Sequence, residues 1–277
     1  MSLLGDIEEQ KEKRNVVYDS DGIIYLSCYK HRDTDNIELM YADFFMRIHS
    51  IESELWKNYA IDKTVIAITS KKNFRNDLTD RWKADRQPKP ESEMTDKQLE
   101  AHREATRLKE YVSKVKALLA KRLSSSIVTV NAIAEADDTF IDLCNNHNYV
   151  GVSMDSDCIN QCKSPVFNYH SKHWKWVHEG RTDIEIFKHI IFDTITGGHN
   201  GNFGIKGKGK VFANNWLEDL EKFEVGFTEW IDLFETPEDA LLNYRVADCS
   251  QVVDDKLRLI EVKDIAELFE EHFTCPF

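Results

Sequence analysis

The chain has 277 residues, of which 42% are hydrophobic, so it can form one large domain or two closely packed ones. No apolar run approaches the roughly 20 residues that a membrane span needs, and residues 1–14 are too polar for a signal peptide. The six cysteines are scattered and lack zinc-finger spacing, which favours reduced thiols in a cytosolic protein.

The net charge of −13 argues at face value against a nucleic-acid partner, but the charge is unevenly distributed. Residues 71–122 contain 15 Lys+Arg and 9 Asp+Glu, whereas residues 213–277 contain 5 Lys+Arg and 17 Asp+Glu. Most of the negative charge therefore lies in the C-terminal quarter, and a basic surface can coexist with it.

In chain order, four short apolar segments have the pattern of strands, at Val16–Tyr18, Thr64–Thr69, Ile127–Val130 and Tyr149–Met154. Amphipathic helical patterns separate them at about 37–58 and 95–123, and residues 23–29 form a buried segment of undecided type. This alternation predicts an α/β fold with a mostly parallel central sheet and flanking helices. Ligands of such sheets gather at the carboxyl ends of the strands.

Acidic side chains are concentrated at several of these strand ends and at one helix start. Six of them are expected to converge: Asp19, Glu135, Asp137, Asp138, Asp155 and Asp157. Carboxylates this close repel one another unless a cation compensates them, and oxygen ligands suit Mg²⁺ or Mn²⁺. The alternative is an ordinary helix start followed by an acidic surface loop, because Asp and Glu favour first helical turns.

Downstream, residues 166–169 and 174–177 have the pattern of a hairpin, and residues 183–192 that of a helix. The stretch 196–210, TGGHNGNFGIKGKGK, then has six glycines and three regularly spaced lysines. Glycines let backbone N–H groups approach a phosphate while lysines supply charge, so the stretch is either a phosphate-binding turn or a flexible loop. The order of a Walker loop is absent, and the remaining residues are acidic and helical.

Taken together, these segments resemble the structure-specific 5′ nucleases, meaning flap endonucleases and 5′→3′ exonucleases, and the phage exonucleases most of all. The resemblance spans about residues 16–215. It is carried by five segments in the same order: Val17-Tyr18-Asp19, Phe74-Arg75 with Trp82-Lys83-Ala84-Asp85-Arg86, Glu135-Ala136-Asp137-Asp138, Asp155-Ser156-Asp157 and Gly204–Gly209.

The resemblance implies a nuclease core at 1–195, with a helical arch at about 71–123. It implies a helix–two-turn–helix duplex-binding element and an acidic helical region within 196–277. The six acids named above would hold two divalent metals, and Lys83 and Arg86 would reach the scissile phosphate from the arch. The DNA contacts would come from Arg75, Gly204, Lys206, Gly207, Lys208, Gly209 and Lys210, with K⁺ at the duplex-binding turn.

Two departures from the family pattern bear on the metal site. The second strand ends in Thr69-Ser70, where the family has an acid, and Gly197-Gly198-His199-Asn200 replaces its Gly-Asp-x-x-Asp. The missing aspartates help hold one metal, so one of the two sites is expected to be weakened. His199, Asn200 and Asp193 are the candidates to replace them.

The expected activity is hydrolysis of phosphodiester bonds near the 5′ ends of duplex or branched DNA, or of RNA primers in RNA–DNA hybrids, during replication or repair. The substrate would be a 5′ flap, a nick or a duplex end. The protein would be a monomer in the cytoplasm of a bacterial or phage-infected cell, without a membrane partner. Two alternatives stay open: a nucleic-acid-binding member of this fold with impaired catalysis, and a haloacid-dehalogenase-like phosphatase that uses Asp19 as nucleophile and Asp21 as general acid.

Overall fold

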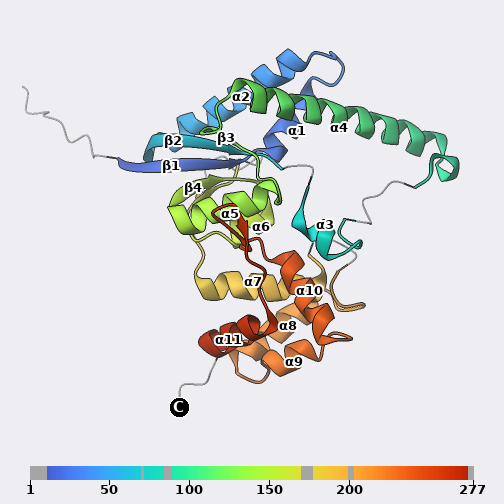
Figure 1. The fold of residues 1–277 in the computed structure, drawn as a ribbon, viewed down its shortest axis with the longest axis vertical. Helices are drawn as coiled ribbons and strands as arrows, with labels where there is room; N and C mark the ends of the chain where they lie inside the picture. Colours follow the sequence, from blue (N-terminus) through green and yellow to red (C-terminus); the bar gives the residue numbers. More distant parts are fainter. Residues whose placement is uncertain (1–10, 70–71, 84–88, 170–176, 199–202, 274–277) are drawn as a thin grey trace, which may run out of the picture.

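A central sheet lies between two layers of helices, and a further group of helices packs below it (Figure 1). This computed structural model describes residues 11–69, 72–83, 89–169, 177–198 and 203–273. Within these residues, no helix is long and apolar enough to cross a membrane.

The sheet has six strands in the order β3-β2-β1-β4-β5-β6, and the first five run parallel. β6 pairs with β5 in the antiparallel direction, and β7 and β8 form a separate hairpin. The strands are β1 (Glu12–Asp19), β2 (Tyr59–Ala67), β3 (Val128–Thr129), β4 (Tyr149–Val152), β5 (Val166–Phe167), β6 (Val177–His178), β7 (Val252–Val253) and β8 (Lys256–Leu257). The predicted α/β fold with a mostly parallel sheet is thus confirmed.

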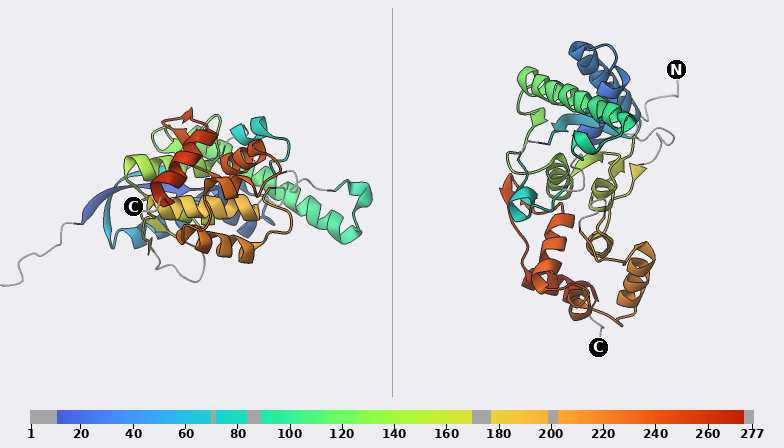
Figure 2. Two further views of the ribbon diagram at one scale, coloured as in Figure 1. Left: turned by 90° about the horizontal axis from the view of Figure 1, so that it is seen from below. Right: turned by 90° about the vertical axis from the view of Figure 1, so that its right-hand side faces the viewer.

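Helices cover both faces of the sheet. α1 (Asp21–Lys30), α2 (Ile37–Leu55) and α4 (Asp96–Arg122) lie on one face, and α5 (Ala136–His147) lies on the other (Figures 1 and 2). The short elements α3 (Phe74–Leu78) and η2 (Glu91–Glu93) lie between α2 and α4 in the chain, and α6 (Ser156–Asn160) follows β4. The C-terminal helices are α7 (Asp183–Thr196), α8 (Lys210–Glu221), α9 (Phe227–Ile231), α10 (Pro237–Ala247) and α11 (Val262–Phe273).

The central strand explains why helices are needed on both faces. Successive side chains of a strand point to opposite faces, so Val16 and Tyr18 pack with α1, α2 and α4, while Val17 packs with α5. All three side chains are fully buried. Because both faces are apolar, β1 lies in the middle of the sheet, and its carboxyl end is enclosed by its neighbours.

The C-terminal helices form a core of their own. Ile186, Ile190 and Ile191 of α7 pack with Trp230, Phe269 and other buried residues of this group. The predicted boundary at 195/196 therefore falls at the end of a helix whose apolar face belongs to the C-terminal core.

Several predicted elements change in extent. Residues 23–29 belong to helix α1, and the second strand ends at Ala67 rather than Thr69. The predicted hairpin is present as the antiparallel pair β5 and β6, although residues 174–176 lie outside the described part of the chain. Helix α4 begins at a capping box on Thr95, and its N-terminal end projects beyond the sheet in the region predicted as the arch (Figure 1).

Candidate metal centre and nucleic-acid interface

The first carboxylate cluster forms where β1 and β4 end beside the start of α5. Asp19 is the last residue of β1, and Ser153 directly follows β4, so the register of the two strands brings them together. The Ser153 hydroxyl donates to Asp19 Oδ2 at 2.8 Å. One carboxylate oxygen each from Asp19 and Asp137 lies within 4.8 Å of the other and of Cys158 Sγ.

These carboxylates are crowded as well as buried. Burial raises the pKa of Asp19 to about 7, and the negative charges of Asp21 and Asp155 add to the shift. The pKa of Asp137 is also raised well above its usual range. Burial is the largest cause, and repulsion from the charges of Asp19, Asp155 and Glu135 adds to it. Like charges in a low-dielectric site disfavour ionisation unless a cation compensates them, so this is an electrostatic environment that favours cation binding.

The loop after β4 places Asp155 beside this centre. The backbone N–H of Asp155 donates to the Ser153 hydroxyl at 2.9 Å, and the N–H of Asp157 donates to Asp155 Oδ1 at 2.8 Å. Asp155 is the N-cap of α6, which fixes its side chain next to the helix start. Asp155 thereby lies close enough to Asp19 and Asp137 to raise the pKa of both.

Glu135 and Lys83 meet at the edge of the centre. The Lys83 ammonium is ion-paired with Glu135 Oε1, and the side chains are 32% and 13% exposed. Lys83 Nζ also lies 4.9 Å from the centre of the Trp82 ring. The predicted arch lysine is therefore beside the acids, whereas Arg86 lies outside the described residues.

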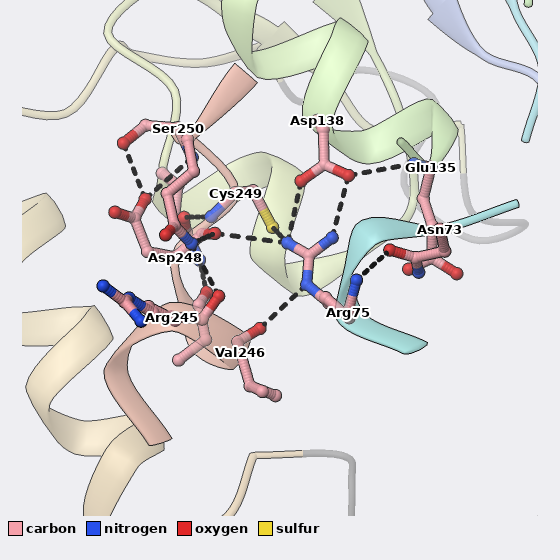
Figure 3. A network of polar contacts seen from close by, with 12 residues as sticks. Asn73, Arg75, Glu135, Asp138, Arg245, Val246, Asp248, Cys249 and Ser250 are labelled. Atoms are coloured by element: carbon pink, nitrogen blue, oxygen red, sulfur yellow. Dashed lines mark hydrogen bonds and ion pairs between the residues drawn. The ribbon is translucent and has the colours of Figure 1, made fainter. Parts of the chain in front are cut away.

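Asp138 and Arg75 have contacts that argue against the roles predicted for them. The guanidinium of Arg75 forms a bidentate ion pair with Asp138, with N–O distances of 2.7 and 2.8 Å, and the side chains are 2% and 0% exposed (Figure 3). The second Asp138 oxygen also accepts the backbone N–H of Glu135 at 2.9 Å. These contacts engage both oxygens of Asp138 and enclose the guanidinium of Arg75, so they favour a structural role for the pair over metal or DNA binding.

The same arginine connects distant parts of the chain. Its Nε donates to the Val246 carbonyl and its Nη2 to the Asp248 carbonyl, both at 3.2 Å (Figure 3). The C-terminal end of α10 and the residue that follows it are thus joined to α3 and to the first turn of α5. We therefore interpret Arg75 and Asp138 as a buried brace that positions the site.

Thr69 occupies the position where the family has an acid. Its hydroxyl accepts the backbone N–H of Ala136 at 2.9 Å, and its own N–H donates to Asp21 Oδ1 at 3.4 Å. Lys116 of α4 binds the same Asp21 oxygen at 2.7 Å. Thr69 therefore orients the start of α5, which carries Asp137, and neighbouring Ser70 lies outside the described residues.

A second cluster combines Asp157 with two residues of α7. His189 Nε2 lies 3.6 Å from Asp157 Oδ1 and 3.3 Å from Asp193 Oδ2. Burial lowers the pKa of His189, but the nearby carboxylates of Asp157 and Asp193 outweigh this effect, so the net shift of the pKa is upward. Asp193, one of the three candidates to replace the missing aspartates, is thus beside Asp157, while His199 and Asn200 lie outside the described residues.

The glycine–lysine stretch connects α7 to α8, and hydrogen bonds join it to α7 and to α10. The N–H of Ile205 donates to the Ile195 carbonyl at 2.9 Å, and the N–H of Gly204 donates to the Asn243 side chain at 2.7 Å. Gly204 and Gly207 have positive φ angles of 85° and 78°. The residues that follow Ile205 in this stretch and are predicted to contact DNA are exposed. They are Lys206, Gly207, Lys208, Gly209 and Lys210.

No protein-family model matches the chain, and no curated protein matches it by sequence. Solved structures do match. The bacteriophage T5 flap endonuclease, in a complex with DNA and metal ions, is 17% identical, with 94% of this chain and 100% of that chain covered and a TM-score of 0.59. A T5 protein co-crystallised with metal ions is 15% identical, with 86% and 90% covered and a TM-score of 0.58.

The catalytic core of Rad2 in complex with DNA substrate also matches, at 15% identity and a TM-score of 0.51, covering 95% of this chain and 88% of that one. The chain has the fold of the structure-specific 5′ nucleases. At these identities the comparisons show the fold.

Sequence reasoning missed His189 and Lys116. One signal for His189 was available, because His189 and Asp193 are four residues apart and such positions share a face of a helix. The helix predicted from the sequence ends at 192, one residue before Asp193, and so does not include the pair. Lys116 had no comparable signal, because its partner Asp21 is almost a hundred residues away in the chain.

Proposed function

We propose that this chain is a metal-dependent 5′ nuclease that hydrolyses phosphodiester bonds near the 5′ ends of duplex or branched DNA. The observation that carries the proposal is the convergence of Asp19, Asp137 and Asp155 at adjoining strand and helix ends, where burial and mutual repulsion raise the pKa of Asp19 and Asp137. The 5′ nuclease fold supports it independently.

The residues fit Mg²⁺ or Mn²⁺. The first cluster offers carboxylate oxygens, which both ions prefer. Burial raises the pKa of the nearby Cys158 thiol, which disfavours the thiolate form that softer metals select. Bound divalent ions would supply charge that stabilises the attacking and leaving oxygens of the phosphodiester. Asp19, Asp137 and Asp155 would hold the first ion, and Ser153 keeps Asp19 oriented towards it.

The remaining residues of this chain would bind and position the substrate. Lys83, which in the structure pairs with Glu135, would turn its ammonium to the non-bridging oxygens of the scissile phosphate, together with Arg86. The exposed side chains of Lys206, Lys208 and Lys210 and the glycines between them would bind the duplex backbone, and K⁺ would occupy the same turn. DNA would be the substrate, with RNA–DNA hybrids as a second class, and the protein would act as a monomer.

The experiment that tests the proposal is cleavage of 5′-labelled flap and nicked duplexes with Mg²⁺, Mn²⁺ or chelator. We expect Asp155→Asn to lower turnover by orders of magnitude while duplex affinity changes only a few-fold, because this carboxylate acts on the metal and not on the duplex. Asp183→Asn is a matched control, since it removes an exposed carboxylate at the start of α7. Equal cleavage by Asp155→Asn and the parent would refute the proposed active site.

Lys83→Ala separates catalysis from binding. It should slow cleavage at saturating substrate, whereas Lys89→Ala, an exposed neighbour in the same segment, should not. An unchanged rate for Lys83→Ala would mean that the lysine only serves its ion pair with Glu135.

Two alternatives have distinct outcomes in these assays. A binding protein with impaired catalysis would bind flaps but leave them intact under every metal condition. A haloacid-dehalogenase-like phosphatase would hydrolyse small phosphomonoesters through an acyl-phosphate on Asp19. The ion pair between Asp21 and Lys116 disfavours that reading, because the proposed general acid is engaged by a cation.

A further inference from the structure

The cluster of Asp157, His189 and Asp193 has the features of a cation site with a nitrogen donor. One carboxylate oxygen of each acid and one ring nitrogen of the histidine all lie within 4.8 Å of one another. Asp157 comes from α6, whereas His189 and Asp193 come from consecutive turns of α7. Three donors from two rigid elements can thus surround one position.

The histidine nitrogen that faces the acids is buried. His189 Nε2 is shielded from solvent and has no hydrogen bond of good geometry, although both acids are near it. A buried ring nitrogen between two carboxylates is arranged as a ligand for a divalent ion. In the same geometry, a protonated ring would only pair with the two acids, so the experiment has to separate these two cases.

There is room for an ion beside the two acids of the cluster. Asp157 and Asp193 line a small cavity of about 40 Å³, and Glu135 and Asp137 of the first cluster line it too. A cavity of this size holds a cation or a water molecule, since about 10–15 Å³ is enough for one water. The cavity also connects the two clusters, as a pair of cations acting on one phosphate requires.

We propose that Asp157, His189 and Asp193 hold the second divalent ion, and that the imidazole makes this position selective for a transition metal over Mg²⁺. Imidazole nitrogen suits Zn²⁺, Co²⁺, Fe²⁺ and Ni²⁺, whereas carboxylate oxygens such as those of Asp19 and Asp137 suit Mg²⁺. The aspartates absent from the Gly197–Asn200 segment are thus replaced by a ligand set of different chemistry. This inference rests on the proposed function only for what the ion does, because its binding can be measured without DNA.

The test titrates the full chain with Co²⁺ in the presence of excess Mg²⁺ and follows the visible absorption of the bound Co²⁺. We expect His189→Gln to weaken Co²⁺ binding by about tenfold or more and to change the spectrum, because a nitrogen ligand is lost. His189→Asp should restore binding of a divalent ion but abolish the preference for Co²⁺ over Mg²⁺. Thermal unfolding of each variant in chelator establishes that it is folded.

Asp19→Asn is the control for the first cluster and should leave the His189-dependent Co²⁺ spectrum in place. Equal Co²⁺ affinity and spectra for the parent and His189→Gln would overturn the inference and reduce the cluster to an ion pair. The proposed function fails in a different way: the parent would bind Co²⁺ through His189 and still cleave no DNA with any metal.

Discussion

Asp137 and Asp138 are neighbours in the first turn of α5, and the structure predicts that their removal has opposite effects. Asp138 neutralises the buried guanidinium of Arg75, whereas the pKa of Asp137 is raised by burial and by surrounding acids. Asp138→Asn should therefore destabilise the protein in chelator. Asp137→Asn should leave its stability unchanged or increase it, because a repulsive charge is lost.

The expected size follows from the burial of the pair. Both side chains of the Arg75–Asp138 pair are almost completely inaccessible. Removing one partner of such a pair leaves an uncompensated buried charge and costs about 3–5 kcal/mol. For a chain of this length that corresponds to a fall in Tm of about 10 °C. Replacing both residues together, as Arg75→Leu with Asp138→Leu, should recover much of the loss, since two apolar side chains leave no buried charge.

The assay is thermal unfolding of each variant in chelator and then with Mn²⁺. A ligand that binds the folded state raises Tm, so the parent and Asp138→Asn should both gain Tm from Mn²⁺, and Asp137→Asn should lose most of that gain. If Asp138→Asn were as stable as the parent and also lost the Mn²⁺ effect, Asp138 would be a metal ligand and the brace would be refuted.

Three further predictions concern other parts of the molecule. Burial raises the pKa of Asp43, but hydrogen bonds from Lys30 and Arg47 lower it to about 2, so its stabilisation should be present above about pH 4 and lost towards pH 2. Because Lys30 is about half exposed, solvent weakens this pair. The free energy of unfolding measured in urea should therefore fall by only about 1 kcal/mol over that pH range. Asp43→Asn should abolish this pH dependence. Gly204→Ala should destabilise the fold more than Gly207→Ala, because a Cβ at 204 would lie 2.3 Å from backbone and one at 207 would meet nothing within 4 Å; equal Tm values for the two variants would contradict this. Each lysine that meets a phosphate contributes about 0.9 to the slope of log K against log salt. The variant with alanine at Lys206, Lys208 and Lys210 should therefore show a flatter slope when DNA binding is measured by fluorescence anisotropy over a salt series. An unchanged slope would mean that the duplex binds elsewhere on the protein.

The sequence alone determined the order of strands and helices and the end of the sheet at which the acids meet. Apolar β-branched segments alternating with amphipathic ones require a parallel sheet, and in such a sheet the residues after the strands share one edge. Asp19 and Asp155 could therefore be assigned to one site. The five ordered segments of the family resemblance led to the fold that the solved structures support.

Only the tertiary structure decided which acids do what. Asp137 and Asp138 look equivalent in the sequence, but adjacent helical residues point about 100° apart, so one faces the acids and the other faces Arg75. The carbonyls that complete the shell around Arg75 come from residues 246 and 248, more than 170 positions away. His189 became a candidate ligand because packing of α7 against α6 brings its ring to Asp157. Contacts across such separations depend on how the two cores pack, and no local pattern of residues encodes them.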